Sequence, residues 1–202
     1  MDQTVVTGMV LQTAPIGEYD RRIVLLTKER GRISAFAKGA RRPNSALVAA
    51  VNPFVFGEFT LYEGKNSNTV VSAKVLNYFS EMRENVESAY YGFYFMELAG
   101  YYTREGQDER DMLKLLYQTL RALLNPRLPN RLIRVVYELK TICINGEAPQ
   151  VFQCVSCGKK EESMRFSPLK GGLVCKACEK AAPDLIELDT SAVYTMQYIE
   201  TS

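Results

Sequence analysis

The sequence of 202 residues predicts an α+β protein with three parts, namely an N-terminal barrel of five short strands, an α-helical domain and a small insertion that contains four cysteines. Three observations support this fold class. Apolar and polar residues alternate with the period of strands in residues 1–79, the period changes to that of helices from about residue 80, and residues 151–182 contain two pairs of cysteines. We expect residues 80–150 to form the helical domain and residues 183–202 to return to it.

The barrel is predicted from five segments with strand periodicity, which cover residues 4–11, 19–27, 32–38, 54–62 and 69–77. Turns are expected at Pro15-Ile16-Gly17, Glu29-Arg30-Gly31 and Glu63-Gly64-Lys65-Asn66, with a helical turn at residues 44–50. This order matches the OB-fold, a five-stranded barrel that binds oligonucleotides or oligosaccharides on one face. An SH3-like barrel is the competing interpretation, because periodicity alone does not separate the two folds.

A basic surface is predicted on the third strand and the loop that follows it. One face of this strand is small and apolar, whereas the other carries cations and an aromatic ring. Guanidinium groups held near a sheet by Pro43 suit a backbone phosphate, and Phe36 offers a stacking surface. With the second strand included, the candidate contacts to nucleic acid are Arg21, Arg22, Arg32, Phe36, Lys38, Arg41 and Arg42. The alternative is a solvated loop whose cations protect an edge strand from pairing.

The charge of the chain is distributed unevenly, although the formal net charge is only +2. Residues 1–50 carry eight Lys and Arg against four Asp and Glu, and residues 111–150 carry six against three. Residues 51–110, between these two zones, carry five against nine. This pattern favours a localised anion-binding surface over a uniformly basic protein.

Three helices are predicted after residue 80, at residues 87–102, 112–124 and 130–145. The first is rich in Tyr and Phe and is expected to be buried on most sides, since tyrosines at this spacing are more typical of a core than of a base-stacking surface. Asp108 and Asp111 are expected to cap the second helix. The expected buried stripe of the third helix consists of Ile133, Val136, Tyr137, Leu139 and Ile144.

A second basic ridge is predicted on the third helix. Arg127, Arg131 and Arg134 recur there at helical spacing. Such a row usually forms a solvated face, but Arg131 and Arg134 are also candidates for a contact to DNA phosphates or to a protein partner.

The cysteines give the most specific motif in the chain. Cys154 and Cys157 form one C-x-x-C hook, and Cys175 and Cys178 form a second hook, with seventeen residues between the two. This spacing predicts a Zn²⁺ site with four thiolate ligands, which is structural because no coordination position stays open. Disulfides and a thioredoxin-like redox pair are the alternatives, but the first is rare in a reducing cytoplasm and the second needs only one hook.

The residue types that are missing argue against an enzyme. The chain has no histidine, so no Ser-His or Cys-His nucleophile pair can form, and it lacks the glycine-rich motifs that bind nucleotides. Carboxylate-only nucleases stay formally open, although the acidic residues are better explained as helix starts. No secretory signal or membrane span is apparent, so we expect a cytoplasmic protein that does not bind membranes.

The whole pattern resembles the bacterial RecO family of recombination mediators. The resemblance covers nearly the whole chain and is carried by Gly8, P-I-G-E-Y-D (15–20), L-L-T-K-E-R-G-R (25–32), A-K-G-A-R-R-P-N-S (37–45), N-P-F (52–54), V-Y-E-L-K (136–140) and N-G-E-A-P (145–149) before Cys154. It implies an N-terminal OB-fold, a helical domain and a zinc-finger insertion. Family members usually continue for several helices beyond the zinc segment, so we expect the C-terminal part of the helical domain to be missing from this sequence.

The resemblance also implies a function and partners. It predicts a nucleoid-associated, non-enzymatic protein that binds single- and double-stranded DNA and anneals complementary strands. Together with RecR it would load RecA onto DNA coated by single-strand-binding protein, although part of the groove for the tail of that protein would lie in the missing helices. The alternative is an adaptor whose OB-fold binds a partner protein and contacts DNA only incidentally.

Overall fold

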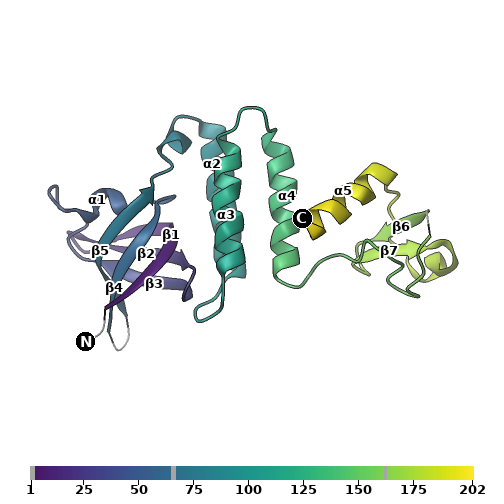
Figure 1. Ribbon diagram of the computed structural model, residues 1–202, viewed down its shortest axis with the longest axis horizontal. Coiled ribbons are helices and arrows are strands. Elements are labelled where there is room, and N and C mark those ends of the chain that lie inside the picture. The colour runs from purple at the N-terminus through teal and green to yellow at the C-terminus, as the bar shows by residue number, and fades with distance from the viewer. Residues whose placement is uncertain (1–2, 65–66, 162) are drawn as a thin grey trace. The chain divides into compact units, whose positions relative to one another are not determined.

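The computed structural model describes residues 3–64, 67–161 and 163–202 (Figure 1). The chain forms two compact units, Met1–Tyr137 and Glu138–Ser202, which are described here one after the other. Among the described residues, no helix is both long enough and apolar enough to span a membrane.

Five strands of the first unit form a closed barrel, β1 (Gln3–Ile16), β2 (Asp20–Thr27), β3 (Gly31–Ala37), β4 (Phe56–Glu63) and β5 (Asn68–Asn77). The strand order around the barrel is β1-β2-β3-β5-β4, and β4 pairs with β1. Every pairing is antiparallel except that of β3 with β5. A short helix, α1 (Leu47–Ala50), lies between β3 and β4. The predicted α+β class and five-stranded OB-like barrel are confirmed.

The first strand is longer than the sequence predicts. It continues through Pro15 to Ile16, which pairs with Asp20, so the expected turn at residues 15–17 begins only at Gly17. Beyond Met9 the strand pairs with β2 alone, and a proline is tolerated there because its missing N–H can face the open edge. In the turn predicted at residues 63–66, Lys65 and Asn66 lie outside the described residues.

The barrel interior is filled by small and branched side chains that alternate along the strands. Ile23 and Leu25 of β2 and Ile33 and Ala35 of β3 point inward and are fully or almost fully buried. Phe59 of β4 is the largest residue of this cluster and has no exposed surface. The intervening residues of β2 and β3 therefore face outward, which makes them available for a binding surface or for packing against helices.

Four helical segments follow the barrel, η1 (Ser80–Arg83), α2 (Val86–Tyr102), α3 (Arg110–Leu123) and α4 (Asn130–Ile144). The side chain of Asn85 begins α2 by accepting a 3.0 Å hydrogen bond from the backbone N–H of Ser88. Figure 1 shows α2 and α3 side by side next to the barrel. Glu109 is the N-cap residue of α3, and Asp108 contributes to the helix start as expected, since its carboxylate accepts a 3.2 Å hydrogen bond from the backbone N–H of Arg110 and also binds the Arg110 guanidinium. Asp111 lies in the first turn and is not the cap residue.

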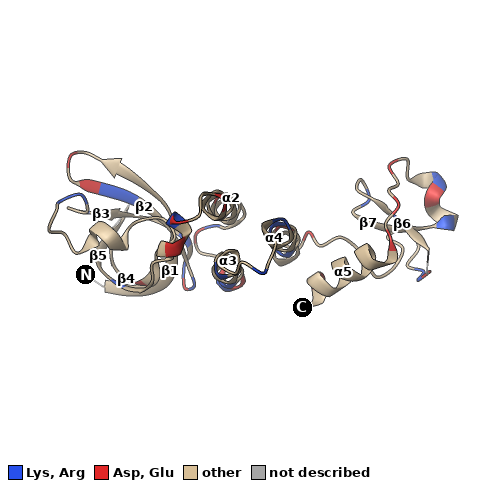
Figure 2. Cartoon of the chain, turned by 90° about the horizontal axis from the view of Figure 1, so that it is seen from above, with Lys and Arg blue, Asp and Glu red and all other residues tan. Residues whose placement is uncertain are grey.

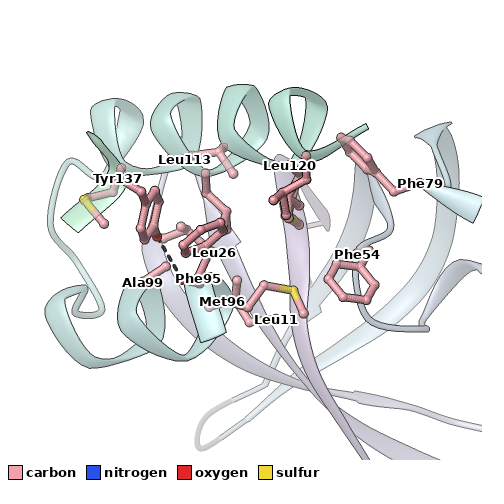
Figure 3. Close-up of a cluster of buried hydrophobic side chains, with 14 of the residues drawn as sticks. Leu11, Leu26, Phe54, Phe79, Phe95, Met96, Ala99, Leu113, Leu120 and Tyr137 are labelled. Atoms are coloured by element: carbon pink, nitrogen blue, oxygen red, sulfur yellow. Dashed lines mark hydrogen bonds between the residues drawn. The ribbon is translucent and has the colours of Figure 1, made fainter. Parts of the chain in front are cut away.

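A second core joins the outside of the barrel to the helices (Figure 3). Leu11 and Leu26 from the strands contact Phe95, Met96 and Ala99 from α2 and leucines from α3 in this cluster. The Tyr137 hydroxyl is buried there and donates a 2.8 Å hydrogen bond to the Phe95 carbonyl oxygen. The hydrogen bond satisfies this polar group, which would otherwise be costly to bury.

The expectation that the aromatic helix is buried on most sides is wrong. Only one face of α2 is buried, whereas Tyr90 and Tyr101 are 74% and 79% exposed and Phe93 is half exposed. In α4, Ile133 and Tyr137 are buried as expected, but Ile144 is exposed. When aromatic residues occur on several sides of a helix, the sequence does not reveal which of those sides other elements will cover.

The second unit contains a two-stranded sheet, β6 (Met164–Ser167) and β7 (Gly172–Cys175), followed by η2 (Lys176–Ala181) and α5 (Thr190–Thr201). The Asp189 side chain caps α5 through a 2.6 Å hydrogen bond from the Ala192 N–H. Gln197 of α5 donates to the Val151 carbonyl oxygen at 2.6 Å, and Lys140 contacts the Ser202 carbonyl oxygen. These hydrogen bonds fasten α5 to both ends of the segment that precedes the cysteines.

Candidate nucleic-acid interface and metal centre

A groove of about 1240 Å³ lies over the outward face of the first three barrel strands. Its floor is formed by residues of β1, β2 and β3, and one side is formed by Phe93 of α2 and by Arg104 and Glu105, which follow α2. All of these residues belong to the first unit. The groove therefore combines strand and helix residues on one concave surface.

Strand register places two of the predicted residues next to each other on the groove floor. Arg22 of β2 pairs with Phe36 of β3, and both side chains line the groove. The Arg22 guanidinium donates a 3.2 Å hydrogen bond to the Ser34 hydroxyl, one residue pair further along the same face. This bond directs the guanidinium along the floor and leaves it exposed beside the aromatic ring. Figure 2 shows this basic stretch at the start of β2.

Two further arginines stand at one end of the groove. The backbone N–H of Arg32 donates a 3.1 Å hydrogen bond to the carbonyl oxygen of Arg104. Gly31 makes this approach possible, because it has a φ of 65° and a Cβ at this position would lie 2.1 Å from the same oxygen. The side chains of Arg32 and Arg104 are both exposed and both line the groove.

The loop that carries Arg104 is also held from its other side. The Glu109 carboxylate accepts a 3.1 Å hydrogen bond from the Arg104 N–H. Burial raises the pKa of Glu109 and outweighs this hydrogen bond, which lowers it. Glu105, which lines the groove, lies 3.9 Å from the guanidinium of Arg30, and Arg30 also binds Glu63 at 2.8 Å. The acidic residue of the groove, Glu105, is thus already paired with Arg30, which does not line the groove.

The basic loop predicted from the sequence is folded onto the turn between β1 and β2. Arg41 donates to the Gly17 carbonyl oxygen at 3.1 Å, and the Arg42 guanidinium lies 5.0 Å from the centre of the Tyr19 ring. The Asp20 carboxylate fixes the loop by accepting a 2.7 Å hydrogen bond from the Gly39 N–H. Lys38 follows β3 and is exposed. These cations form a separate cluster that does not line the groove.

Three predicted contacts, Arg21, Arg131 and Arg134, do not line the groove. Arg21 is half-buried on the other side of β2 from Arg22, where it donates a 2.7 Å hydrogen bond to Asn52 and ties the barrel to the segment before β4. Arg131 and Arg134 lie on α4, and the Arg134 guanidinium is 5.4 Å from the centre of the Tyr94 ring. Strand parity explains the position of Arg21, since adjacent strand residues point to opposite faces.

Arg134 also lines a shallow apolar pocket of about 650 Å³. The pocket is formed by the exposed face of α2 and by α4, and its other lining residues are Val86, Glu87, Tyr90, Tyr91 and Tyr94. Tyr90 and Val86 are 74% and 70% exposed. An exposed apolar surface with one cation at its edge is typical of a site that binds a protein segment.

The four cysteines come together in the second unit, as predicted. The Sγ atoms of Cys154, Cys157, Cys175 and Cys178 all lie within 4.8 Å of one another, and those of Cys157 and Cys175 are 3.6 Å apart. Four sulfurs placed about 2.3 Å from a tetrahedral ion would be about 3.8 Å apart. The cluster therefore has the size needed to hold one metal ion with all four sulfurs.

Local hydrogen bonds shape the hooks around this cluster. The Cys154 N–H donates to the Lys159 carbonyl oxygen and the Gly158 N–H donates to the Cys154 carbonyl oxygen, both at 2.8 Å. Cys175 ends β7 and Cys178 lies on η2, so the second hook spans the end of the strand. Cys154 and Cys175 are buried with Val174 and Ala182 in a small core of their own.

The four thiols lie close enough to shift one another's pKa values. Burial raises the pKa of Cys154, but N–H donors from Cys175, Cys157 and Ser156 dominate and lower it to about 6. Hydrogen bonds with the sulfurs of Cys175 and Cys157 raise the pKa of Cys178 to about 12. A metal ion that binds all four sulfurs must therefore displace the proton of Cys178, and its charge compensates the crowded thiolates.

Two groove residues, Phe93 and Arg104, were missed by sequence reasoning. The aromatic sequence of residues 87–102 predicts a core position for Phe93, and no motif marks Arg104. No local pattern could have found them, because both reach the groove only through the packing of α2 and its following loop against the barrel.

Comparison with known proteins covers both units. Residues 1–79 match the family described as "Recombination protein O N terminal", and residues 83–202 match "Recombination protein O C terminal". Proteins named "DNA repair protein RecO" are similar along most of the chain. The one from Alkaliphilus metalliredigens is 36% identical over 95% of this chain and 78% of its own length. Those from Acetivibrio thermocellus and Bacillus pumilus are 34% and 32% identical, over 96% and 92% of this chain and 77% and 72% of their own lengths. The chain therefore belongs to the RecO family of DNA repair proteins.

Proposed function

We propose that this chain is a non-enzymatic mediator of recombination that binds DNA, anneals complementary strands and, with RecR, loads RecA onto single-stranded DNA coated by single-strand-binding protein. The observation that carries the DNA-binding part is the groove on the OB-like barrel, where Arg22, Arg32 and Phe36 share one exposed face. Membership of a DNA repair family supports the biological setting. The RecR and RecA steps rest on the family resemblance.

The chemistry of the groove suits single-stranded nucleic acid. Arginine guanidinium groups bind phosphate oxygens in a bidentate manner, and this interaction supplies much of the affinity of DNA-binding proteins. Phe36 is partly exposed beside Arg22, so a base can stack on the ring while the adjacent phosphate binds the cation. Neither contact depends on base identity, which fits a mediator that acts on DNA of any sequence.

The basic loop is proposed to add phosphate contacts outside the groove. Lys38, Arg41 and Arg42 are exposed, and the contacts of Arg41 and Arg42 to the β1–β2 turn hold them in place. In OB-folds this turn borders the nucleic-acid site. Arg131 and Arg134 are proposed as a second contact surface. Arg21 is also proposed as a contact, with its guanidinium oriented by the hydrogen bond to Asn52.

The four-cysteine cluster is proposed to bind structural Zn²⁺. Four thiolates favour zinc, and a closed shell leaves no position for a substrate. We also propose the domain division at residues 1–79, 80–150, 151–182 and 183–202. The two family matches, which meet between residues 79 and 83, support the first boundary. A cytoplasmic, nucleoid-associated location follows from the proposed DNA-binding role.

The second candidate is a protein-interaction adaptor, and one observation favours it. The pocket of Val86, Glu87, Tyr90, Tyr91, Tyr94 and Arg134 offers apolar surface with one acidic and one basic residue, which suits a mainly apolar protein segment. This pocket lies on α2 and α4, whereas the adaptor inferred from the sequence binds its partner through the OB-like barrel, so the pocket supports a protein-binding role at a different surface. We propose single-strand-binding protein as a partner, and its binding would use the same kind of contacts as those offered by this pocket.

Binding of fluorescently labelled single-stranded DNA by the purified full chain, at low and moderate salt, tests the proposed function. We expect binding by the wild type and weaker binding by an Arg22→Ala/Arg32→Ala double variant. Lys74→Ala is the matched control, because Lys74 is an exposed cation on β5 that pairs with Glu58 away from the groove. Equal affinities of the double variant and the wild type, with both folded, would overturn the proposal and favour the adaptor.

A further inference from the structure

We propose that Phe93 and Arg104 form a second wall of the groove, which holds unstacked bases and phosphates of a single strand and makes the groove selective for single-stranded over duplex DNA. This inference rests on the proposed DNA-binding function and deepens it. It assigns the groove to one class of ligand and extends the binding surface from the barrel to α2 and the residues after it.

The ring of Phe93 packs against a core residue on one side and is exposed to the groove on the other. Its ring centre lies 4.7 Å from that of Phe54, which is buried in the core between barrel and helices. Half of the Phe93 side chain nevertheless remains exposed, and it lines the groove together with Pro53. A rigid ring at the edge of a groove loses little conformational entropy when a base stacks on it.

Arg104 is held in place by its backbone. Its carbonyl oxygen accepts from the Arg32 N–H, and its own N–H donates to Glu109, both at 3.1 Å. A third hydrogen bond, from the Gly106 N–H to the Arg30 carbonyl oxygen at 3.0 Å, fastens the same loop to the start of β3. The exposed guanidinium thus projects from an anchored backbone into the groove lined by Arg32.

The two walls together select single strands. Phe36 lines the groove from β3 and Phe93 lines it from α2, so the groove offers aromatic surfaces of two different elements. Aromatic side chains stack only on bases whose faces are free, and in a duplex these faces are covered by neighbouring bases. Arg22, Arg32 and Arg104 then supply cations for the phosphates of the same strand.

The basic loop provides an internal contrast. Lys38, Arg41 and Arg42 do not line the groove and are exposed, and the Arg42 guanidinium lies over the ring of Tyr19. Phosphates are present in single strands and in duplexes alike. The loop should therefore contribute to binding of both forms, whereas Phe93 of the second wall should contribute to binding of single strands alone.

The test compares binding of one sequence as a single strand and as a duplex, with the full chain. Phe93→Ala should weaken single-strand binding roughly tenfold, without changing the salt dependence, and leave duplex binding within about twofold. Arg104→Ala should weaken single-strand binding and lower its salt slope by about 0.7.

Tyr101→Ala and Lys114→Ala are the matched controls, because both residues are exposed on the helices and neither lines the groove. A triple alanine variant of Lys38, Arg41 and Arg42 should weaken binding of both DNA forms.

The outcomes separate this inference from the proposed function. If Phe93→Ala and Arg104→Ala bind single strands as tightly as the wild type while Arg22→Ala and Arg32→Ala bind more weakly, the second wall is disproved and the proposed function stands. Equal losses for single strand and duplex in Phe93→Ala would overturn the selectivity. If the wild type binds no DNA, both proposals are wrong. Melting temperatures of all variants establish that each one is folded.

Discussion

The backbone N–H of Arg32 donates a hydrogen bond to the carbonyl oxygen of Arg104, 3.1 Å away, and so joins the start of β3 to the segment that follows α2. The two residues are far apart in the sequence, yet both of their side chains line one groove. The bond fixes the helical side of the groove to the barrel. The position of Arg104 therefore depends on Gly31, which lets the two backbones meet.

Replacing Gly31 by alanine should disrupt this contact. The new Cβ would lie 2.1 Å from the Arg104 carbonyl oxygen, and the φ of 65° is unfavourable for alanine. We expect a loss of about 2 kcal/mol in the free energy of unfolding, measured by urea denaturation, together with weaker single-strand binding. Gly106→Ala is the matched control, since its φ is 76° but a Cβ there has open space. Equal losses for both variants would show that backbone strain, and not the contact, explains the effect.

Phe95→Ala should destabilise the core far more than Phe93→Ala. Phe95 has no exposed surface and packs 4.5 Å from the Tyr137 ring, measured between ring centres, whereas Phe93 is half exposed. The expected cost of Phe95→Ala is roughly 3–5 kcal/mol in the free energy of unfolding, because the truncation leaves a cavity. Thermal and urea unfolding of both variants provide the measurement. A melting temperature of Phe95→Ala equal to that of the wild type would contradict the assigned core.

The buried Glu109 should give stability a specific dependence on pH. Burial raises its pKa above the usual 4.5, so the folded state binds a proton more tightly than the unfolded state does. This contribution stabilises the fold at acidic pH and is lost as the pH rises through the raised pKa. The unfolding free energy of the wild type, relative to that of Glu109→Gln, should therefore fall as the pH increases from about 4.5. A difference that grows with pH over this range would show that the sign is wrong.

Freshly purified protein should contain close to one zinc per chain, measured by elemental analysis. Metal binding to a four-thiolate site can contribute on the order of 10 kcal/mol to the folding of its module. Cys157→Ser or Cys175→Ser should release the metal and unfold residues 151–182 locally, while the barrel keeps its own unfolding transition. Cys143→Ser is the matched control, because Cys143 lies on α4 outside the cluster. Less than half a zinc per chain in the wild type would count against the zinc assignment.

Features set by local sequence could be predicted. The alternation of apolar and polar residues in β3 fixes which side chains point outward, so Arg32 and Phe36 were correctly expected on one face. The spacing within each C-x-x-C hook likewise fixes the local geometry, and the cysteine cluster followed from it. Turn residues separate the five strands along the chain, although β1 extends past Pro15 because only one neighbour pairs with it there.

Features set by packing between distant elements could not be predicted. Phe93 looked like a core residue because the sequence of α2 is aromatic on every side, and only the arrangement of the barrel and α3 decides which side is covered. Arg104 joins the groove through a backbone hydrogen bond that no side-chain pattern reports. The sequence does not tell which of Arg21 and Arg22 faces the groove, and the strand register shows that Arg22 does, whereas Arg21 binds Asn52.

The salt dependence of single-strand binding tests the central claim, that the barrel groove binds the DNA backbone, most directly. Each phosphate contact releases about 0.7 counterions on a single strand, so the slope of log affinity against log salt concentration should become shallower by roughly 1.4 in the Arg22→Ala/Arg32→Ala variant. The slope of Lys74→Ala should match that of the wild type, since Lys74 lies outside the groove. A folded double variant that keeps both the affinity and the slope of the wild type would contradict the assignment of the groove to DNA.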